Sequence, residues 1–419
     1  MHDEVNKALL ANMAALLARF AHLGTRTTRR FSGGDASLGA RTTRRFSGGD
    51  ASLHRSAITQ HLWALRDGAF APPPPRADGS RVPAHSRVCV DYKLTSDAEL
   101  RSRYESAFGT LRVGRLLEDM DALAGSVAFL HVDDGDAATD PPILVTASME
   151  KMELVDERLS LDEDYALVGQ LAWAGRSSLE IAAELRRADG AAALRAVFTF
   201  VARKADGSGA AAVPPLVPET ADERARHAAA AAKQAARKAR RAAAARAPDD
   251  DDGAAVDALL GPGRVARDFP GQADDGCVPM GSTSLRNALM CHPQERNTAG
   301  RVFGGVLMRR ALELAFATAF SYGGAAPLTK ALDRVDFVRP VDVGSLLALK
   351  SHVVFAEGTT MHVDVSAAVW RPDKRESTLT NTFSFVFTVD GPRPLKRVLP
   401  STRAEARLQL AAMARATEP

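Results

Sequence analysis

Two stretches of the chain repeat one order of hydrophobic patterns, a long helical period followed by four strand-like runs. Apolar residues at spacings of three and four predict a helix at 111–132 in the first stretch and at 303–322 in the second. Apolar runs rich in β-branched and aromatic residues predict the strands. They lie at 143–154, 165–173, 178–187 and 193–202, then at 330–338, 346–355, 361–370 and 378–389.

The repeated order indicates two copies of one domain, at 88–218 and 283–397. Each copy has one long apolar helix and a mostly antiparallel sheet, so the predicted class is α+β. The economical packing is a sheet wrapped around its helix, because the two layers then share one core.

The flanking segments have a different composition. Residues 1–60 combine apolar residues at helical spacing with an Arg/Ser/Thr-rich tract, which is typical of a mitochondrial transit peptide. The tract at 26–38 recurs exactly at 41–53, which favours disorder. Residues 61–87 contain a proline run and are predicted to be a linker, and 398–419 a C-terminal tail helix.

Residues 219–282 hold an Ala/Arg-rich helix and an acidic linker. The interspersed arginines admit two interpretations, a stripe that binds nucleic acid or a solvated inter-domain helix. No aromatic residue interleaves with the basic ones, so bases have no stacking surface. We therefore predict the solvated helix and no nucleic-acid partner.

Composition excludes several classes of site. The chain has 419 residues, a net charge of +3 and three cysteines without a CxxC pair, so neither a zinc site nor a disulfide framework is indicated. Apolar runs are too short for a membrane span. No GxSxG nucleophile elbow, P-loop or dinucleotide fingerprint stands where its fold would need it.

The second copy contains a distinctive loop before its helix. Asn297 stands six residues before Phe303, which is followed by Gly304 and Gly305. An amide side chain, two glycines and a helix N-terminus suit an anion or a polarised carbonyl.

This motif, followed by the run at 336–344 (DFVRPVDVG), resembles the hotdog-fold acyl-coenzyme A thioesterases. The first copy, with 114–121 (GRLLEDMD) and the later 175–178 (GRSS), resembles the other half of the ACOT-type mitochondrial members that carry two hotdog domains. The resemblance implies a tandem (double) hotdog that hydrolyses fatty acyl-CoA to free fatty acid and coenzyme A, without metal or cofactor. It also implies edge-to-edge pairing of the two sheets, a homo-oligomer that is a trimer of double hotdogs, and the mitochondrial matrix.

The resemblance also assigns site residues. The family's loop asparagine corresponds to Asn297, and its helix acid, seven residues after a helix-starting glycine, corresponds to Asp121 after Gly114. Gly305 is the equivalent glycine of the second copy, but Leu312 stands where its acid would be. Copy one lacks the loop asparagine, so one working and one degenerate site are expected. Glu313 is a candidate acid for a second site.

The chemistry leaves some roles open. Asp121 acts as general base on water or attacks directly to form an anhydride. Asn297 orients the water, hydrogen-bonds the carbonyl, caps the helix or forms a turn. Gly114 and Gly305 allow close approach of substrate to a helix N-terminus. Glu118 and Asp119 are interpreted as solvated face residues.

Coenzyme A is expected to meet Gly175, Arg176 and Ser177, because arginine pairs well with phosphate. The alternative for these three residues is a tight strand turn.

Three other functions compete with hydrolysis. A hotdog hydratase or dehydratase would need a histidine paired with an acid, and neither helix carries a histidine between its glycine and the acid position. A catalytically dead acyl-CoA-binding protein would bind without turnover. A nucleic-acid-binding protein would show steeply salt-dependent binding to any duplex.

Overall fold

The computed structural model describes residues 59–60, 74–134, 136, 139, 141–156, 158–244, 253–272, 274–297, 300–333, 335–391 and 394–417. The predicted leader lies outside these residues except for Thr59 and Gln60, as does the predicted linker up to residue 73.

The first half contains the predicted helix and all the predicted strand runs. It begins with β1 (Val88–Tyr92), α3 (Ala98–Tyr104) and the long helix α4 (Val113–Val132). The later strands are β2 (Ile143–Met149), β3 (Met152–Leu154), β4 (Tyr165–Ala174), β5 (Ser178–Arg187) and β6 (Ala192–Arg203). The predicted strand 143–154 is thus two strands, and β1 was not predicted from the sequence.

The second half repeats this order. It begins with β8 (Leu285–Met290), also not predicted, and the long helix α7 (Gly304–Gly323). The later strands are β9 (Pro327–Leu332), β10 (Val335–Asp336), β11 (Leu346–Glu357), β12 (Thr360–Arg371) and β13 (Glu376–Val389). Short 3-10 helices are η3 (Pro83–Ser86), η4 (Pro270–Gln272), η5 (Met280–Thr283) and η6 (Pro293–Glu295).

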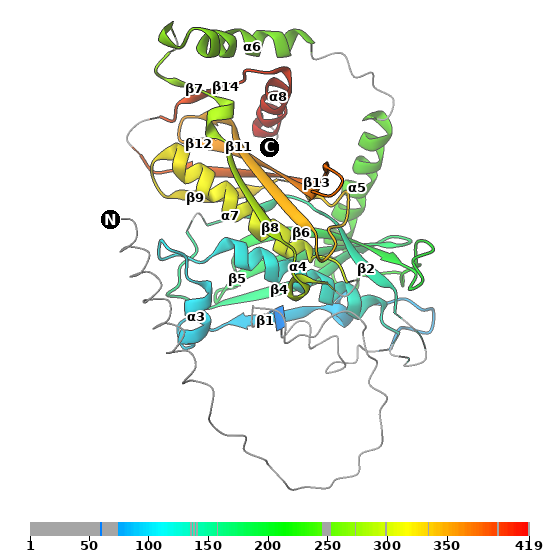
Figure 1. The fold of residues 1–419 in the computed structure, drawn as a ribbon. Helices are drawn as coiled ribbons and strands as arrows, with labels where there is room; N and C mark the ends of the chain where they lie inside the picture. The colour runs from blue at the N-terminus through cyan, green and yellow to red at the C-terminus, as the bar shows by residue number, and fades with distance from the viewer. Residues whose placement is uncertain are drawn as a thin grey trace, which may run out of the picture. The chain divides into compact units, whose positions relative to one another are not determined.

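The sheets of the two halves join edge to edge into one sheet of 12 strands, ordered β1-β4-β5-β6-β3-β9-β13-β12-β11-β8, with β2 paired to β6 and β10 (Figure 1). At the seam, Met152 of β3 pairs with Leu332 of β9, and Met149 of β2 pairs with Val335 of β10. All of these pairings are antiparallel. The double hotdog predicted from the sequence is confirmed.

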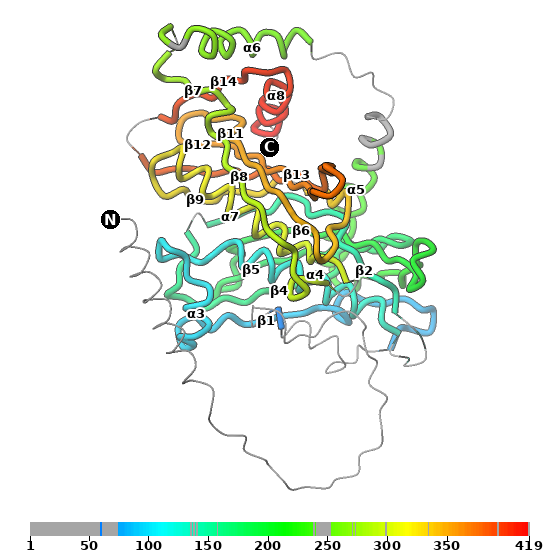
Figure 2. Tube along the Cα trace, viewed as in Figure 1, coloured from blue at the N-terminus to red at the C-terminus, as the bar shows by residue number. Residues whose placement is uncertain are grey.

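The long helices α4 and α7 pack against the sheet and against each other, as the traces in Figure 2 show. Leu116, Leu117 and Met120 of α4 have no exposed surface. Gly169 of β4 faces α4, and a Cβ there would lie 2.7 Å from the Leu123 side chain. Close packing of sheet on helix therefore requires glycine at this position.

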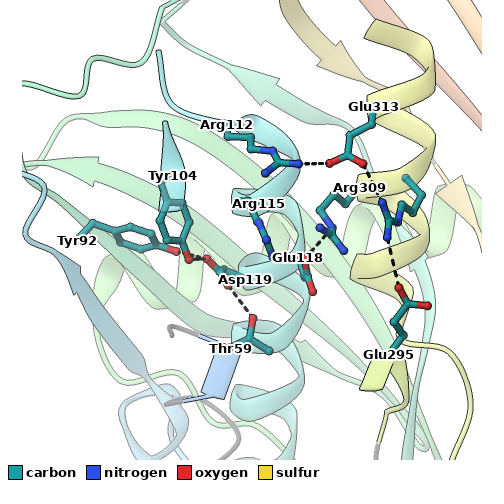
Figure 3. Close-up of polar contacts among 11 residues, drawn as sticks. Thr59, Tyr92, Tyr104, Arg112, Arg115, Glu118, Asp119, Glu295, Arg309 and Glu313 are labelled. Carbon is teal, nitrogen blue, oxygen red and sulfur yellow. Dashed lines mark hydrogen bonds and ion pairs between the residues drawn. The ribbon is translucent and has the colours of Figure 1, made fainter. Parts of the chain in front are cut away.

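A buried ion pair lies between the two long helices. Glu118 stands four residues after Gly114, and Arg309 stands four residues after Gly305, so these two residues occupy equivalent positions in the two copies. Arg309 Nε lies 2.9 Å from Glu118 Oε2, and the side chains are 5% and 4% exposed (Figure 3). Burial raises the pKa of Glu118, although Arg309 opposes the shift. The interpretation of Glu118 as a solvated residue is wrong, because α7 covers this face of α4.

Helix α5 (Ala221–Ala244) packs on the sheet face opposite α4. Its Ala230 is buried, and Arg237 donates to Glu150 Oε1 at 2.8 Å and to Ser148 Oγ at 3.0 Å. Most residues of α5 are exposed, and its small alanines let one side lie close to the strands.

The predicted acidic linker contains a further helix, α6 (Gly253–Asp268), which packs with the C-terminal helix α8 (Arg403–Thr417). Strands β7 (Cys277–Pro279) and β14 (Arg397–Leu399) pair in parallel beside them. No helix among the described residues has the length and hydrophobicity to cross a membrane.

Candidate active site

Helix α4 carries Asp121 to the N-terminal end of α7. The Gly305 N–H donates to Asp121 Oδ2 at 2.6 Å, and the Thr146 hydroxyl donates to Oδ1 at 3.1 Å. Gly305 is the second residue of α7, where backbone N–H groups have no partner within the helix. Asp121 has no exposed surface. The site, called here the acidic junction, is therefore built from both halves.

Two glycines make this close approach possible. A Cβ on Gly305 would lie 2.8 Å from Glu118 Cα, and a Cβ on Gly304 would lie 3.0 Å from Asp121 Oδ2. A side chain at Gly305 would force the helices apart, and one at Gly304 would press on the Asp121 carboxylate and the Phe337 ring. The glycines thus permit close contact between the helices, and the predicted close approach of substrate stays a prediction.

Thr146 and Phe337 also belong to the acidic junction, and sequence reasoning missed both. The β2–β6 register shifts between Thr146 and Ser148, so Ala147 is a bulge residue. The Phe337 N–H donates to Ala147 O at 3.0 Å, and a Cβ on Gly304 would lie 3.2 Å from the Phe337 ring. Bulges commonly redirect side chains beside active sites. The 336–344 motif contained Phe337, but no sequence signal marked the bulge.

Asn297 lies in the loop that leads to α7. Its Oδ1 accepts from the Arg301 N–H at 3.1 Å, and its own N–H donates to Arg301 O at 2.6 Å. The loop then pairs Phe303 N–H with Glu295 O at 2.8 Å, which fixes the entry into the helix. The turn-forming alternative for Asn297 is therefore realised in this structure, and its contact with substrate stays a prediction.

The segment Gly175–Ser177 forms the hairpin turn between β4 and β5. The Gly175 N–H donates to Ser178 O at 2.8 Å, and a Cβ on Gly175 would lie 2.5 Å from the Trp173 ring. Ser177 O accepts from Ala202 N–H at 2.8 Å, while the Arg176 side chain is exposed. The tight-turn alternative holds for the backbone, and Arg176 is presented to solvent.

Gly114 lies at a second junction, related to the first by the internal repeat. A Cβ on Gly114 would lie 3.1 Å from Arg309 Cγ and 3.7 Å from Leu312 Cδ2. Seven residues separate Gly114 from Asp121, about 10 Å along the helix. The structure thus brings Asp121 and Gly305 together and places Gly114 with Leu312. Glu313, the candidate second acid, pairs with Arg112 (Figure 3).

Asp119 is buried on the far side of α4 from the acidic junction. Its carboxylate accepts from the Thr59 hydroxyl at 2.7 Å, the Tyr92 hydroxyl at 2.8 Å and the Tyr104 hydroxyl (Figure 3). Burial raises the pKa of Tyr92 well above its ordinary value. The interpretation of Asp119 as solvated is wrong, because β1 and α3 cover it. These bonds fix the rotation of α4 and hence the direction of Asp121.

Within the described ranges, no group of three or more His, Cys, Asp or Glu side chains has the arrangement of a metal site.

Comparison with known proteins gives consistent results. The Thioesterase superfamily model matches residues 299–377. Acyl-coenzyme A thioesterase 4, mitochondrial, of Humulus lupulus is 38% identical over 86% of this chain and 73% of its own length. Acyl-coenzyme A thioesterase 9, mitochondrial, of Homo sapiens is 34% identical over 78% of this chain and 75% of its own length.

Among solved structures, an acyl-CoA hydrolase from Staphylococcus aureus in complex with butyryl coenzyme A is 25% identical over 33% of this chain and 88% of that chain, with a TM-score of 0.32.

Proposed function

This chain belongs to the acyl-coenzyme A thioesterase family, and from that premise we propose that the acidic junction hydrolyses fatty acyl-CoA to free fatty acid and coenzyme A. One observation carries the proposal: the carboxylate of Asp121 is fixed against the N-terminus of α7 by the Gly305 N–H at 2.6 Å. The carboxylate supplies a base, and the positive end of the helix stabilises the negative charge that develops on the thioester oxygen.

In this proposal Asp121 removes a proton from water, which attacks the thioester carbonyl. The Gly305 N–H and the Thr146 hydroxyl each donate to one oxygen of this carboxylate and hold it in place while it accepts the proton of the water. Asn297 orients the water or the carbonyl from the loop. In water labelled with oxygen-18, a base mechanism leaves Asp121 unlabelled over many turnovers, whereas an anhydride that water attacks at the aspartyl carbon leaves label in the carboxylate of Asp121.

The Asp121→Asn variant tests the assignment. It removes the base and keeps the size of the side chain, so we expect kcat to fall roughly 10²- to 10⁴-fold. Glu313→Gln is the matched control, because Glu313 lies at the second junction, and its kcat should remain that of the parent. Thiol release from short to long acyl-CoAs measures both. Full activity in Asp121→Asn together with loss of activity in Glu313→Gln would assign catalysis to the second junction and reject the acidic junction as the active site.

The hairpin turn at Gly175–Ser177 is proposed to meet coenzyme A. Ser178 pairs with Val201, which pairs with Val145 of β2, next to Thr146. The turn thus lies two strand spacings, about 10 Å, from the strand that contacts Asp121. An exposed arginine at that distance suits a phosphate of the bound nucleotide.

The remaining proposals concern conditions and setting. We propose that hydrolysis needs no metal or cofactor, so turnover should survive dialysis against a chelator.

The names of the relatives support a mitochondrial location, and we propose the matrix, which import followed by N-terminal sequencing would test. A trimer of double hotdogs is proposed as the assembly. Exposed Met290 and Trp370 offer apolar surface for it, and light scattering should give three chain masses.

A further inference from the structure

A cavity of about 450 Å³ opens at the second junction. Its apolar lining includes Phe108, Leu312, Phe316 and Leu328, and Gly114 lies in its wall. The volume is within the roughly 300–1,000 Å³ range of pockets that hold small molecules. In this cavity Leu312 stands where the acidic junction has Asp121, and the nearby Glu313 is paired with Arg112.

The cavity occupies the position that the internal repeat relates to the acidic junction. Strand β9 takes the place of β2 in the other half. The register shifts between Thr146 and Ser148 in β2 and between Thr329 and Ala331 in β9. Thr329 is thus the equivalent of Thr146, and it lines the cavity. The second junction keeps the glycine and the threonine, while Leu312 replaces the acid.

The replacements at this junction change its chemistry from polar to apolar. Leu312 is 4% exposed and places methyl groups against Gly114, where the acidic junction places a carboxylate against Gly305. Phe108 packs on Phe316 and Phe320, with ring centroids 5.6 and 5.7 Å apart, yet remains 47% exposed. Covering an exposed aromatic side chain with an apolar ligand removes apolar surface from water, which favours binding of that ligand.

Three of the charged groups that line the cavity are already paired. Arg112 binds Glu313 at 2.5 Å, and Arg158 binds Asp390 at 2.6 Å. A ligand would therefore contact mainly the apolar wall of the cavity. A long alkyl chain with a polar head suits such a site, because the chain would lie against the wall and the head would remain near solvent.

From the repeat and the apolar lining, we infer that the second junction holds a fatty acyl chain and does not hydrolyse it. The inference rests on the proposed function for the identity of the ligand class. The chain arrives either as acyl-CoA or as the free fatty acid that the acidic junction releases.

Binding stoichiometry tests the inference on the full chain. Titration calorimetry would use S-dodecyl-coenzyme A, a thioether that cannot be hydrolysed, together with dodecanoate and coenzyme A alone. We expect two alkyl chains per protein chain. Two molecules of the thioether would identify acyl-CoA as the source, and one thioether plus one dodecanoate would identify the free acid. A single alkyl ligand per protein chain would overturn the inference.

Blocking the cavity locates the second ligand. Ala326→Trp and Ala107→Trp fill it from two sides and spare the acidic junction. Each should reduce the stoichiometry to one, or weaken the second site at least about tenfold, while kcat/KM at low substrate stays unchanged. Ala191→Trp, on an exposed turn, should still bind two. A second ligand that survives both cavity variants would contradict the inference.

Failure of the proposed function is distinguishable from failure of this inference. Loss of turnover in Asp121→Asn establishes the acidic junction whatever the number of bound ligands. Conversely, two bound ligands in a protein whose Asp121→Asn variant still turns over would support the second junction and reject the assignment of the base.

Discussion

Thr146 orients the carboxylate of Asp121 through a single hydrogen bond of 3.1 Å to Oδ1. Thr146→Val keeps the shape of the side chain and removes the donor, so we expect kcat to fall about tenfold, the value of one neutral hydrogen bond. Thr146→Ser should restore most of the activity. Thr329→Val is the matched control at the second junction. Equal losses of kcat in Thr146→Val and Thr329→Val would show that valine lowers activity by disturbing the strands and that the hydrogen bond to Asp121 is not the cause.

His131 makes stability depend on pH. Burial lowers its pKa to about 4, and its Nε2 lies 2.9 Å from Pro214 O. In the unfolded chain the pKa of His131 is near 6.5, so the unfolded state binds the proton more readily than the folded state. The buried neutral imidazole therefore makes its full contribution to folding stability above pH 6.5, and that contribution is lost as pH falls toward 4. At pH 5 the loss amounts to about 2 kcal/mol.

His131→Gln keeps a donor for Pro214 O and removes the titration. Urea unfolding at pH 7.5 and at pH 5 should therefore show a smaller difference in the variant than in the parent. His292→Gln, at an exposed position, is the control and should behave as the parent does. An unchanged difference in His131→Gln would reject the buried neutral histidine.

At the scale of elements, the pair Glu118–Arg309 determines which helices can meet. Glu118→Gln leaves a buried guanidinium without its anion, which should cost about 3–5 kcal/mol of unfolding free energy. The double variant Glu118→Met/Arg309→Met replaces both charges with apolar groups and should be close to the parent in stability. Urea unfolding of Glu118→Met, Arg309→Met and the double variant measures the coupling. Additive losses would show that the two charges act independently.

The sequence predicted the long helices and the central strands, because burial on one or both faces leaves a clear apolar period. The edge strand β8 was missed because most of its residues are exposed, so no hydrophobic run marks it. Asp121 and Gly305 were found from a resemblance to a known family. Their 2.6 Å contact could not be predicted in this way, because it depends on how two helices far apart in the sequence pack together. The bulge that directs Thr146 and the cover over Asp119 depend on strand pairing and on β1, which no local pattern encodes.

For the whole molecule, fusion of two copies allows the halves to become different. Pairing of two first halves would place Glu118 opposite Glu118, and pairing of two second halves would place Arg309 opposite Arg309. Like charges buried together cost several kcal/mol, whereas the observed pair attracts. The same asymmetry concentrates the acid in one junction and the apolar cavity in the other.

This asymmetry predicts how separated halves behave. Residues 74–252 and 253–419, expressed as two chains with different tags, should each lack thioesterase activity, because Asp121 lies on one and Gly305 on the other. Co-expression should recover a complex with turnover, since the seam β3–β9 and the pair Glu118–Arg309 both favour the mixed pairing. Co-purification through both tags and thiol release measure the outcome. Glu118→Arg in the first half should abolish recovery, and Arg309→Glu in the second should restore part of it. Activity in either half alone would reject a site shared between the halves.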